Sequence, residues 1–183
     1  MAAAILFSLF CGIITDYSLS KHLTPRHYPI TVLISVAASI LLNLTFDDPT
    51  EIIKGFLFAQ TLIIIGYCDA MTHEIPNLAL IPIVITGLIR VQLIPALGGA
   101  FLVSVPFLLI AVLSKGGIGG GDVKLMAAAG FLLGPTGVIA ATVTGFAVFL
   151  ASLPFVSRSV KQKAYAMAPY LGIGCFLAYL FKL

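Results

Sequence analysis

The sequence has 183 residues, of which 60% are hydrophobic and only 9% are charged, with a formal net charge of +3. A soluble domain of this length leaves about a third of its unfolded surface in contact with water, so it cannot bury this much apolar surface. These numbers exclude water-soluble globular, disordered and fibrous proteins, and they indicate a polytopic membrane protein whose surface is solvated by lipid.

Apolar runs suited to membrane-crossing helices follow one another along the chain. A helix needs about 20 mostly apolar residues to cross the membrane core. A removable signal peptide is not expected, because no basic residue precedes the first run and no Ala-x-Ala cleavage site follows it. The first five expected spans are residues 1–15, 29–46, 52–68, 77–94 and 96–113.

Residues 125–156 contain no charged residue and are too many for one straight span. The pair Gly134-Pro135 lies in the middle of this run and predicts a break, so we expect two helices. Residues 164–181 form the final apolar run. The predicted fold is an all-α, polytopic integral membrane helical bundle with about eight transmembrane spans, in which residues 1–183 form a single membrane-embedded domain.

The basic residues predict how this bundle is oriented. With eight spans, the loops after spans one, three, five and seven share one side, and they carry seven of the ten Lys and Arg residues. The other side carries Lys54, Arg90 and Lys182 together with the acidic turn 47–51. The positive-inside rule places the first side in the cytoplasm, so both termini are expected to face outward.

Two connections on the predicted cytoplasmic side carry the candidate chemistry. Asp69 follows the third span, and Asp122 follows the fifth span after a glycine-rich stretch at residues 116–121. From Asp122 to Phe131 a helix extends only roughly 14 Å, under half of a membrane core of about 30 Å. Unless that helix starts earlier, Asp122 must lie below the membrane surface. Glycines lack a Cβ, so their backbone is able to pack closely against neighbouring helices or an extended peptide.

Two carboxyl groups held close together suit proteolysis. They share one proton, so that one acts as a base and the other as an acid while water attacks a peptide carbonyl. The sequence contains neither a His-Glu-x-x-His motif nor a Gly-x-Ser-x-Gly motif. Its three cysteines, Cys11, Cys68 and Cys175, are widely separated, which indicates neither a zinc site nor a disulfide framework. We therefore expect aspartic-protease chemistry that needs no metal, cofactor or thiol.

Three short motifs carry a resemblance to a known family. Asp69 is followed by Ile75-Pro76-Asn77, and a later segment reads Gly119-Gly120-Gly121-Asp122-Val123-Lys124-Leu125. The final span contains Ala168-Pro169-Tyr170-Leu171-Gly172. Together these motifs resemble the type IV prepilin peptidase family, which are intramembrane aspartic proteases of the Gly-x-Gly-Asp class. The resemblance extends from about residue 52 to the C-terminus.

The resemblance implies a membrane aspartic endopeptidase that cleaves the short basic leader from type IV prepilins or pseudopilins. Cleavage is expected at the cytoplasmic face of a prokaryotic plasma membrane, just before the hydrophobic helix of the substrate, in type IV pilus assembly or protein secretion. The expected partners are this substrate and the lipid bilayer, and no nucleic acid is expected. The catalytic pair corresponds to Asp69 and Asp122, and the candidate substrate-binding residues are Gly119, Gly121, Glu74 and Lys124.

Many bacterial members of that family also methylate the new N-terminus and carry a four-cysteine zinc insert after the first span. Here the corresponding segment, residues 16–28, is short and contains no cysteine. A peptidase-only form without this insert is therefore expected.

Other interpretations of the acidic residues remain open. Asp16, at the cytoplasmic end of the first span, is a rival for the first catalytic acid, although no Ile-Pro-Asn follows it. Asp69 and Asp122 would otherwise be helix-capping acids. Lys124 would either steady an ionised aspartate or contact phospholipid headgroups.

Three other functions compete with the prepilin peptidase. Paired aspartates also suit a small transporter that couples to protons or cations. A presenilin-like protease shares the Gly-x-Gly-Asp motif, but its usual Tyr-Asp is replaced here by Tyr67-Cys68-Asp69. A non-catalytic assembly factor would tolerate the loss of either aspartate.

Overall fold

The computed structural model describes residues 2–22, 30–114, 119–156 and 165–182, and its regular secondary structure over these residues is entirely helical. This agrees with the predicted all-α fold. The seven helices of the described residues are α1 (Ala2–His22), α2 (Ile30–Thr45), α3 (Pro49–Thr72), α4 (Asn77–Leu88), α5 (Leu93–Leu113), α6 (Gly120–Val156) and α7 (Ala168–Leu180).

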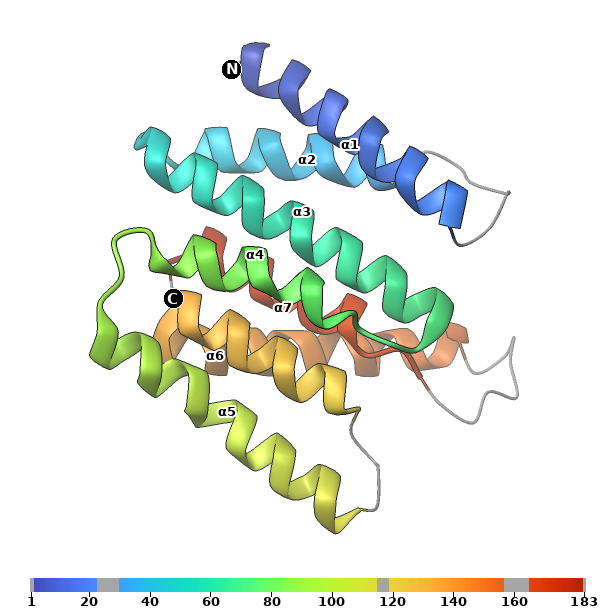
Figure 1. Cartoon of the computed structure of the whole chain (residues 1–183), viewed down its shortest axis with the longest axis vertical. Helices are drawn as coiled ribbons and strands as arrows, with labels where there is room; N and C mark the ends of the chain where they lie inside the picture. Colours follow the sequence, from blue (N-terminus) through green and yellow to red (C-terminus); the bar gives the residue numbers. More distant parts are fainter. Residues whose placement is uncertain (1, 23–29, 115–118, 157–164, 183) are drawn as a thin grey trace.

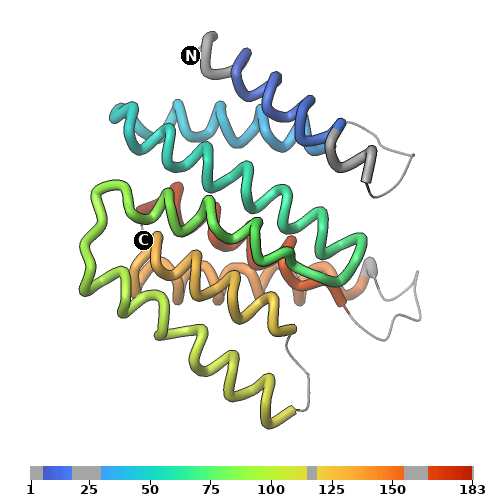
Figure 2. Tube along the Cα trace, in the orientation of Figure 1, coloured from blue at the N-terminus to red at the C-terminus, as the bar shows by residue number. Residues whose placement is uncertain are grey.

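The helices lie side by side in one bundle, with α1 at one edge and α5 at the opposite edge (Figure 1). Helix α2 packs between α1 and α3, and α3 in turn contacts α4 and α7. Helix α6 packs against α4, α5 and α7, so it joins the two halves of the bundle. The trace in Figure 2 shows that the α3–α4 turn and the starts of α6 and α7 lie at the same end of the molecule.

Helix α6 is two helices joined at Gly134, as the sequence predicts. Gly134 has φ 76° and ψ −177°, a left-handed backbone conformation that favours glycine. The segment after Gly134 runs alongside α5, because Gly98 lies against Pro135 and the ring centroids of Phe107 and Phe146 are 6.0 Å apart. The segment before Gly134 runs the opposite way (Figure 1). Gly134 therefore forms the turn of a helical hairpin.

Small residues allow the helices to approach closely. A β-carbon placed on Gly99 of α5 would collide with the carbonyl oxygen of Gly130 in α6. One placed on Gly174 of α7 would collide with the carbonyl oxygen of Ala141. Helices in membranes associate through such small-residue contacts, because lipid provides no hydrophobic drive between them.

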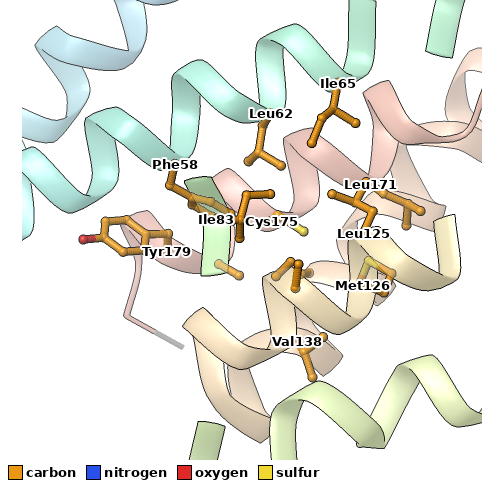
Figure 3. Close-up of a cluster of buried hydrophobic side chains, with 14 of the residues drawn as sticks. Phe58, Leu62, Ile65, Ile83, Leu125, Met126, Val138, Leu171, Cys175 and Tyr179 are labelled. Atoms are coloured by element: carbon orange, nitrogen blue, oxygen red, sulfur yellow. The ribbon is translucent and has the colours of Figure 1, made fainter. Parts of the chain in front are cut away.

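The core forms where α3, α4, α6 and α7 meet (Figure 3). Phe58 and Ile65 of α3 and Ile83 of α4 are fully buried there, together with Leu125 of α6 and Leu171 of α7. The outer surface is also apolar, with large aliphatic side chains exposed along α5. Its Ile94 is 87% exposed and its Leu113 is 82% exposed, as expected for a surface that lipid covers.

Polar contacts tie the helices together at the end of the bundle opposite Asp69. Asp48 precedes α3 and accepts a hydrogen bond from the backbone N–H of Thr50, 2.9 Å away, and it pairs with Arg90 from the α4–α5 turn. These contacts hold the pKa of Asp48 below its usual range, with the larger effect from the hydrogen bond of the Thr50 N–H and the smaller from Arg90. The hydroxyl of Tyr179 in α7 donates to the carbonyl oxygen of Glu51 at 2.8 Å.

Among the residues that the structure describes, three helical segments are long and apolar enough to cross a membrane: α3, α5 and residues 120–154 of α6. Shorter apolar helices cover residues 6–17 of α1 and the whole of α2, α4 and α7. The result is a bundle of apolar helices, as predicted, although α4 has only 12 residues and α7 only 13.

Several predicted helix ends were wrong by a turn or more. Helix α3 continues to Thr72, so Asp69 lies inside its last turn and not in the connection after it. Helix α6 begins at Gly120 and therefore includes Asp122. Helix α4 ends at Leu88, six residues before the predicted end, because the chain turns at Arg90, which has φ 55°.

Candidate active site

Asp69 is held at the end of α3 by contacts to both its backbone and its side chain. His73 adopts a left-handed conformation with φ 54°, ends the helix, and donates its N–H to the carbonyl oxygen of Asp69 at 2.9 Å. The Asp69 side chain is 7% exposed, and its Oδ2 accepts the backbone N–H of Ala168 at 2.9 Å. This hydrogen bond joins the end of α3 to the start of α7.

Asp122 lies in the first turn of α6 and is also 7% exposed. Its backbone N–H donates to the carbonyl oxygen of Gly119 at 3.0 Å. Its Oδ1 is buried without a hydrogen-bond partner among the described residues. A buried carboxyl oxygen without a partner is unusual in proteins and calls for a water, ion or substrate group to satisfy it.

The two carboxyl groups line one pocket of about 310 Å³ between the α3–α4 turn and the start of α6. The structure thus brings together every residue that the sequence predicts for the site. The lining residues are Asp69, His73, Glu74, Ile75, Asn77, Gly119, Gly120, Gly121, Asp122 and Lys124.

The glycines before Asp122 differ in their surroundings. A β-carbon on Gly121 would lie 3.0 Å from Cβ and Cγ1 of Ile75, which is tighter than nine in ten real contacts of this kind. A β-carbon on Gly119 would lie 3.1 Å from Oδ2 of Asp122, whereas one on Gly120 would meet nothing within 4 Å. Gly121 is therefore the position at which α6 packs closely against the α3–α4 turn. Residues 116–118 of the predicted glycine-rich stretch lie outside the described residues.

Lys124 lies at the exposed edge of the pocket. Its Nζ donates a hydrogen bond to Oδ1 of Asn77 at 3.0 Å, which links α6 to the first residue of α4. From the sequence, the expected partner of Lys124 was an aspartate or a phospholipid headgroup. The side-chain amide of Asn77 was not predicted. Glu74 and His73 are exposed side chains of the α3–α4 turn, although both line the pocket.

The role of Ala168 was also missed. Its N–H is one of the donors in the first turn of α7 that no helical carbonyl satisfies, and Pro169, which follows, has no N–H of its own. A proline near the start of the final predicted span was the available signal, but only the fold shows that Asp69 lies beside Ala168.

Asp16, the rival for the first acid, does not line this pocket. It is half-buried in α1, where its Oδ1 accepts a hydrogen bond from the Thr31 hydroxyl of α2 at 2.7 Å.

Within the part of the chain that the structure describes, no three His, Cys, Asp or Glu residues are grouped to hold a metal ion. Two buried carboxyl groups that share a polar pocket inside an apolar helical bundle are the arrangement expected of an intramembrane aspartic protease.

Comparison with known proteins gives the family. Residues 56–157, which include both aspartates, match the type IV leader peptidase family. A prepilin leader peptidase/N-methyltransferase from Bacillus subtilis (strain 168) is 31% identical over 164 residues, which cover 84% of this chain and 66% of that protein. The chain belongs to the type IV leader peptidase family. No solved structure matches it.

Proposed function

We propose that this protein is a membrane aspartic endopeptidase that cleaves the short basic leader from type IV prepilins or pseudopilins. The observation that carries this proposal is the polar pocket that Asp69 and Asp122, both buried, line together. Membership of the leader peptidase family supports the substrate class, as does the name of the relative, although the chain spans only 66% of that relative's length.

The surroundings of the two carboxyl groups suggest different roles for them. Asp69 is fixed by the N–H of Ala168, so it is the better placed to orient a water molecule and accept its proton. Asp122 has an oxygen without a partner, so it is the better placed to hold a proton and donate it to the scissile carbonyl. The water would attack the carbonyl carbon, the amine would leave with a proton, and the carboxyl pair would return to its starting state. Gly119, Gly121, Glu74 and Lys124 would bind the substrate around this centre.

The proposed orientation places the pocket at the cytoplasmic face. If the hairpin at Gly134 supplies two spans, the chain crosses the bilayer eight times as a single membrane-embedded domain over residues 1–183. The connections on the side of the pocket then carry seven of the ten Lys and Arg residues, which favours the cytoplasm. This would be the plasma membrane of a prokaryote, where the leader of a prepilin is exposed.

We further propose that the protein cleaves without methylating the new N-terminus. The relative is named as both a peptidase and an N-methyltransferase. Residues 16–28 of this chain contain no cysteine, so they provide no counterpart of the zinc insert that many methylating members carry there.

The main alternative is a small transporter that uses the paired aspartates to move protons or cations. Family membership supports the peptidase instead. A transport protein would also need the pocket to open to both faces of the membrane in turn, and the described pocket lies at one end of the bundle, beside the α3–α4 turn.

The test is to incubate the purified protein in detergent or proteoliposomes with a prepilin and to locate the cut by mass spectrometry. Cleavage between the basic leader and the hydrophobic helix is the expected result, with no product from Asp69→Asn or Asp122→Asn protein. Intact prepilin after long incubation with the folded wild-type protein, across a panel of prepilins and pseudopilins, would overturn the proposal.

A further inference from the structure

We propose that an apolar groove between α2, α3 and α7 holds the hydrophobic helix of the substrate while its leader lies in the carboxylate pocket. This proposal rests on the proposed function and names a surface that the catalytic residues do not include. The groove has a volume of about 630 Å³. Its walls come from Thr31, Ala37 and Leu41 of α2, Ala59 and Ala70 of α3, and Gly172 of α7, among others.

One end of the groove lies next to the candidate active site. Gly66 and Ala70 line the groove and lie on α3 within one turn of Asp69. Pro169 of α7 also lines it and directly follows Ala168, whose N–H is bonded to Asp69. The contact between α3 and α7 therefore lies where the pocket and the groove adjoin. A peptide that passes from the pocket into the groove runs along one side of this contact.

The dimensions of the groove suit a helix. Its lining on α3 runs from Ala59 to Met71, which corresponds to about 18 Å of helix axis and to about twelve residues of a helix lying alongside. Small residues such as Ala37, Ala59 and Gly66 line it. Small side chains at such a surface let a second helix approach closely, as in other helix pairs within membranes.

Negative charge at the end of the groove nearest the candidate active site favours a peptide with a basic leader over a phospholipid. Thr31, which lines this end, donates its hydroxyl to the Asp16 carboxylate. Glu74 is exposed at the neighbouring pocket. A lipid acyl chain fits the apolar walls equally well, but the Asp16 carboxylate beside Thr31 would repel the phosphate of its headgroup. A basic leader joined to an apolar helix matches both the walls and the charge.

A steric substitution tests the groove. Ala37 is exposed and lines the groove, whereas Ala147 of α6 is also an exposed alanine but does not line it. We compare Ala37→Trp with Ala147→Trp on two substrates: a prepilin with its whole hydrophobic helix, and a peptide truncated a few residues after the scissile bond. For Ala37→Trp, kcat/KM for the long substrate should fall at least tenfold relative to kcat/KM for the short one. For Ala147→Trp the ratio should match that of the wild type.

The two substrates separate the two proposals. Cleavage of both by the wild-type protein supports the peptidase function, and its absence overturns that function whatever the groove does. A wild-type ratio for Ala37→Trp, in protein that still cleaves the short peptide, overturns the groove alone.

Photocrosslinking provides a second test that does not depend on turnover. A benzophenone amino acid is placed at position 37 or 147 of the Asp122→Asn protein in liposomes, and uncleaved prepilin is added. Cross-links from position 37 to the hydrophobic helix, with none from position 147, are the expected result. Cross-links from position 37 to lipid alone, with prepilin present in excess, would assign the groove to lipid.

Discussion

Gly121 provides a sharp test of how the two aspartates are held in place. A β-carbon at this position would lie 3.0 Å from Cβ and Cγ1 of Ile75 and 3.1 Å from its Cδ1. The neighbouring Gly120 has open space, because a β-carbon there would meet nothing within 4 Å. Alanine at the two positions therefore adds the same methyl group in a crowded and in an open environment.

The expected loss of activity follows from this crowding. A methyl group at Gly121 requires the α3–α4 turn or the start of α6 to move by a few tenths of an ångström, and valine requires more because two further carbons branch from its Cβ. Overpacking of this kind typically costs about 1–3 kcal/mol. Since Asp122 directly follows Gly121, the shift changes its position relative to Asp69. A misplacement of about 1 Å in an active site lowers the rate by roughly a hundredfold.

We expect kcat for Gly121→Ala to fall about tenfold and kcat for Gly121→Val to fall at least a hundredfold. Gly120→Ala should stay within about threefold of the wild-type value. Turnover is measured with purified protein and a full-length prepilin, with the product quantified by mass spectrometry. Thermal unfolding of each variant separates a shifted site from an unfolded protein.

The Ile75→Ala substitution makes the argument specific. It removes Cγ1 and Cδ1, two of the three nearest atoms that the new side chain would meet, and keeps Cβ. The double variant Gly121→Val, Ile75→Ala should therefore recover at least tenfold of the lost kcat. Equal activities for Gly121→Ala and Gly120→Ala would refute the reasoning. So would a double variant that is no more active than Gly121→Val alone.

Four further outcomes are expected. Asp69→Asn and Asp122→Asn should each abolish cleavage in folded protein, because a carboxamide cannot exchange the required proton. Asp16→Asn should keep the wild-type kcat. Turnover near the wild-type rate in Asp69→Asn or Asp122→Asn protein would remove that residue from the catalytic pair. Glu74→Gln should weaken leader binding by less than about tenfold, as for an exposed charge contact, and complete loss of cleavage would instead make Glu74 a catalytic candidate. A variant without cysteines, and wild-type protein in excess chelator, should both stay active, and inactivity of either would contradict metal-free and thiol-free catalysis. Labelled methyl groups should not pass from S-adenosylmethionine to the cleaved pilin, and their appearance there would show that methyltransferase activity is present.

The sequence predicts those features of the fold that depend on local chemistry. Gly134-Pro135 interrupts an uncharged run, and the structure places the turn of a hairpin there because Gly134 adopts a left-handed conformation. The alternation of spans places Asp69 and Asp122 at the same end of the bundle, and they do line one pocket. The first inference needed only a Gly-Pro pair within an uncharged run, and the second needed only the order of apolar and polar residues along the chain.

Other features depend on contacts that no local pattern records. Helix α3 continues four residues past its predicted end at residue 68, and His73 then ends it in a left-handed conformation. The Thr72 hydroxyl, which donates to the carbonyl oxygen of Cys68 at 2.9 Å, also lies 3.3 Å from the backbone nitrogen of Glu74. The bond from Ala168 to Asp69 joins residues 99 positions apart. Apolar periodicity cannot locate such an end or such a partner, because neither depends on hydrophobicity.

The short helices around the pocket explain how a site within a membrane could be supplied with water. Helix α4 has 12 residues, which corresponds to about 18 Å, and residues 120–133 of α6 correspond to roughly 21 Å. The bond from Lys124 to Asn77 holds the first turns of these two segments together. A bilayer core is about 30 Å thick, so segments this short cross it only where the bilayer thins or where the turn between α3 and α4 lies below the surface. Non-helical backbone is tolerated at such depth only where protein buries it or water wets it. The exposed Glu74 and Lys124 at the pocket favour water, and water is the reagent that peptide hydrolysis consumes.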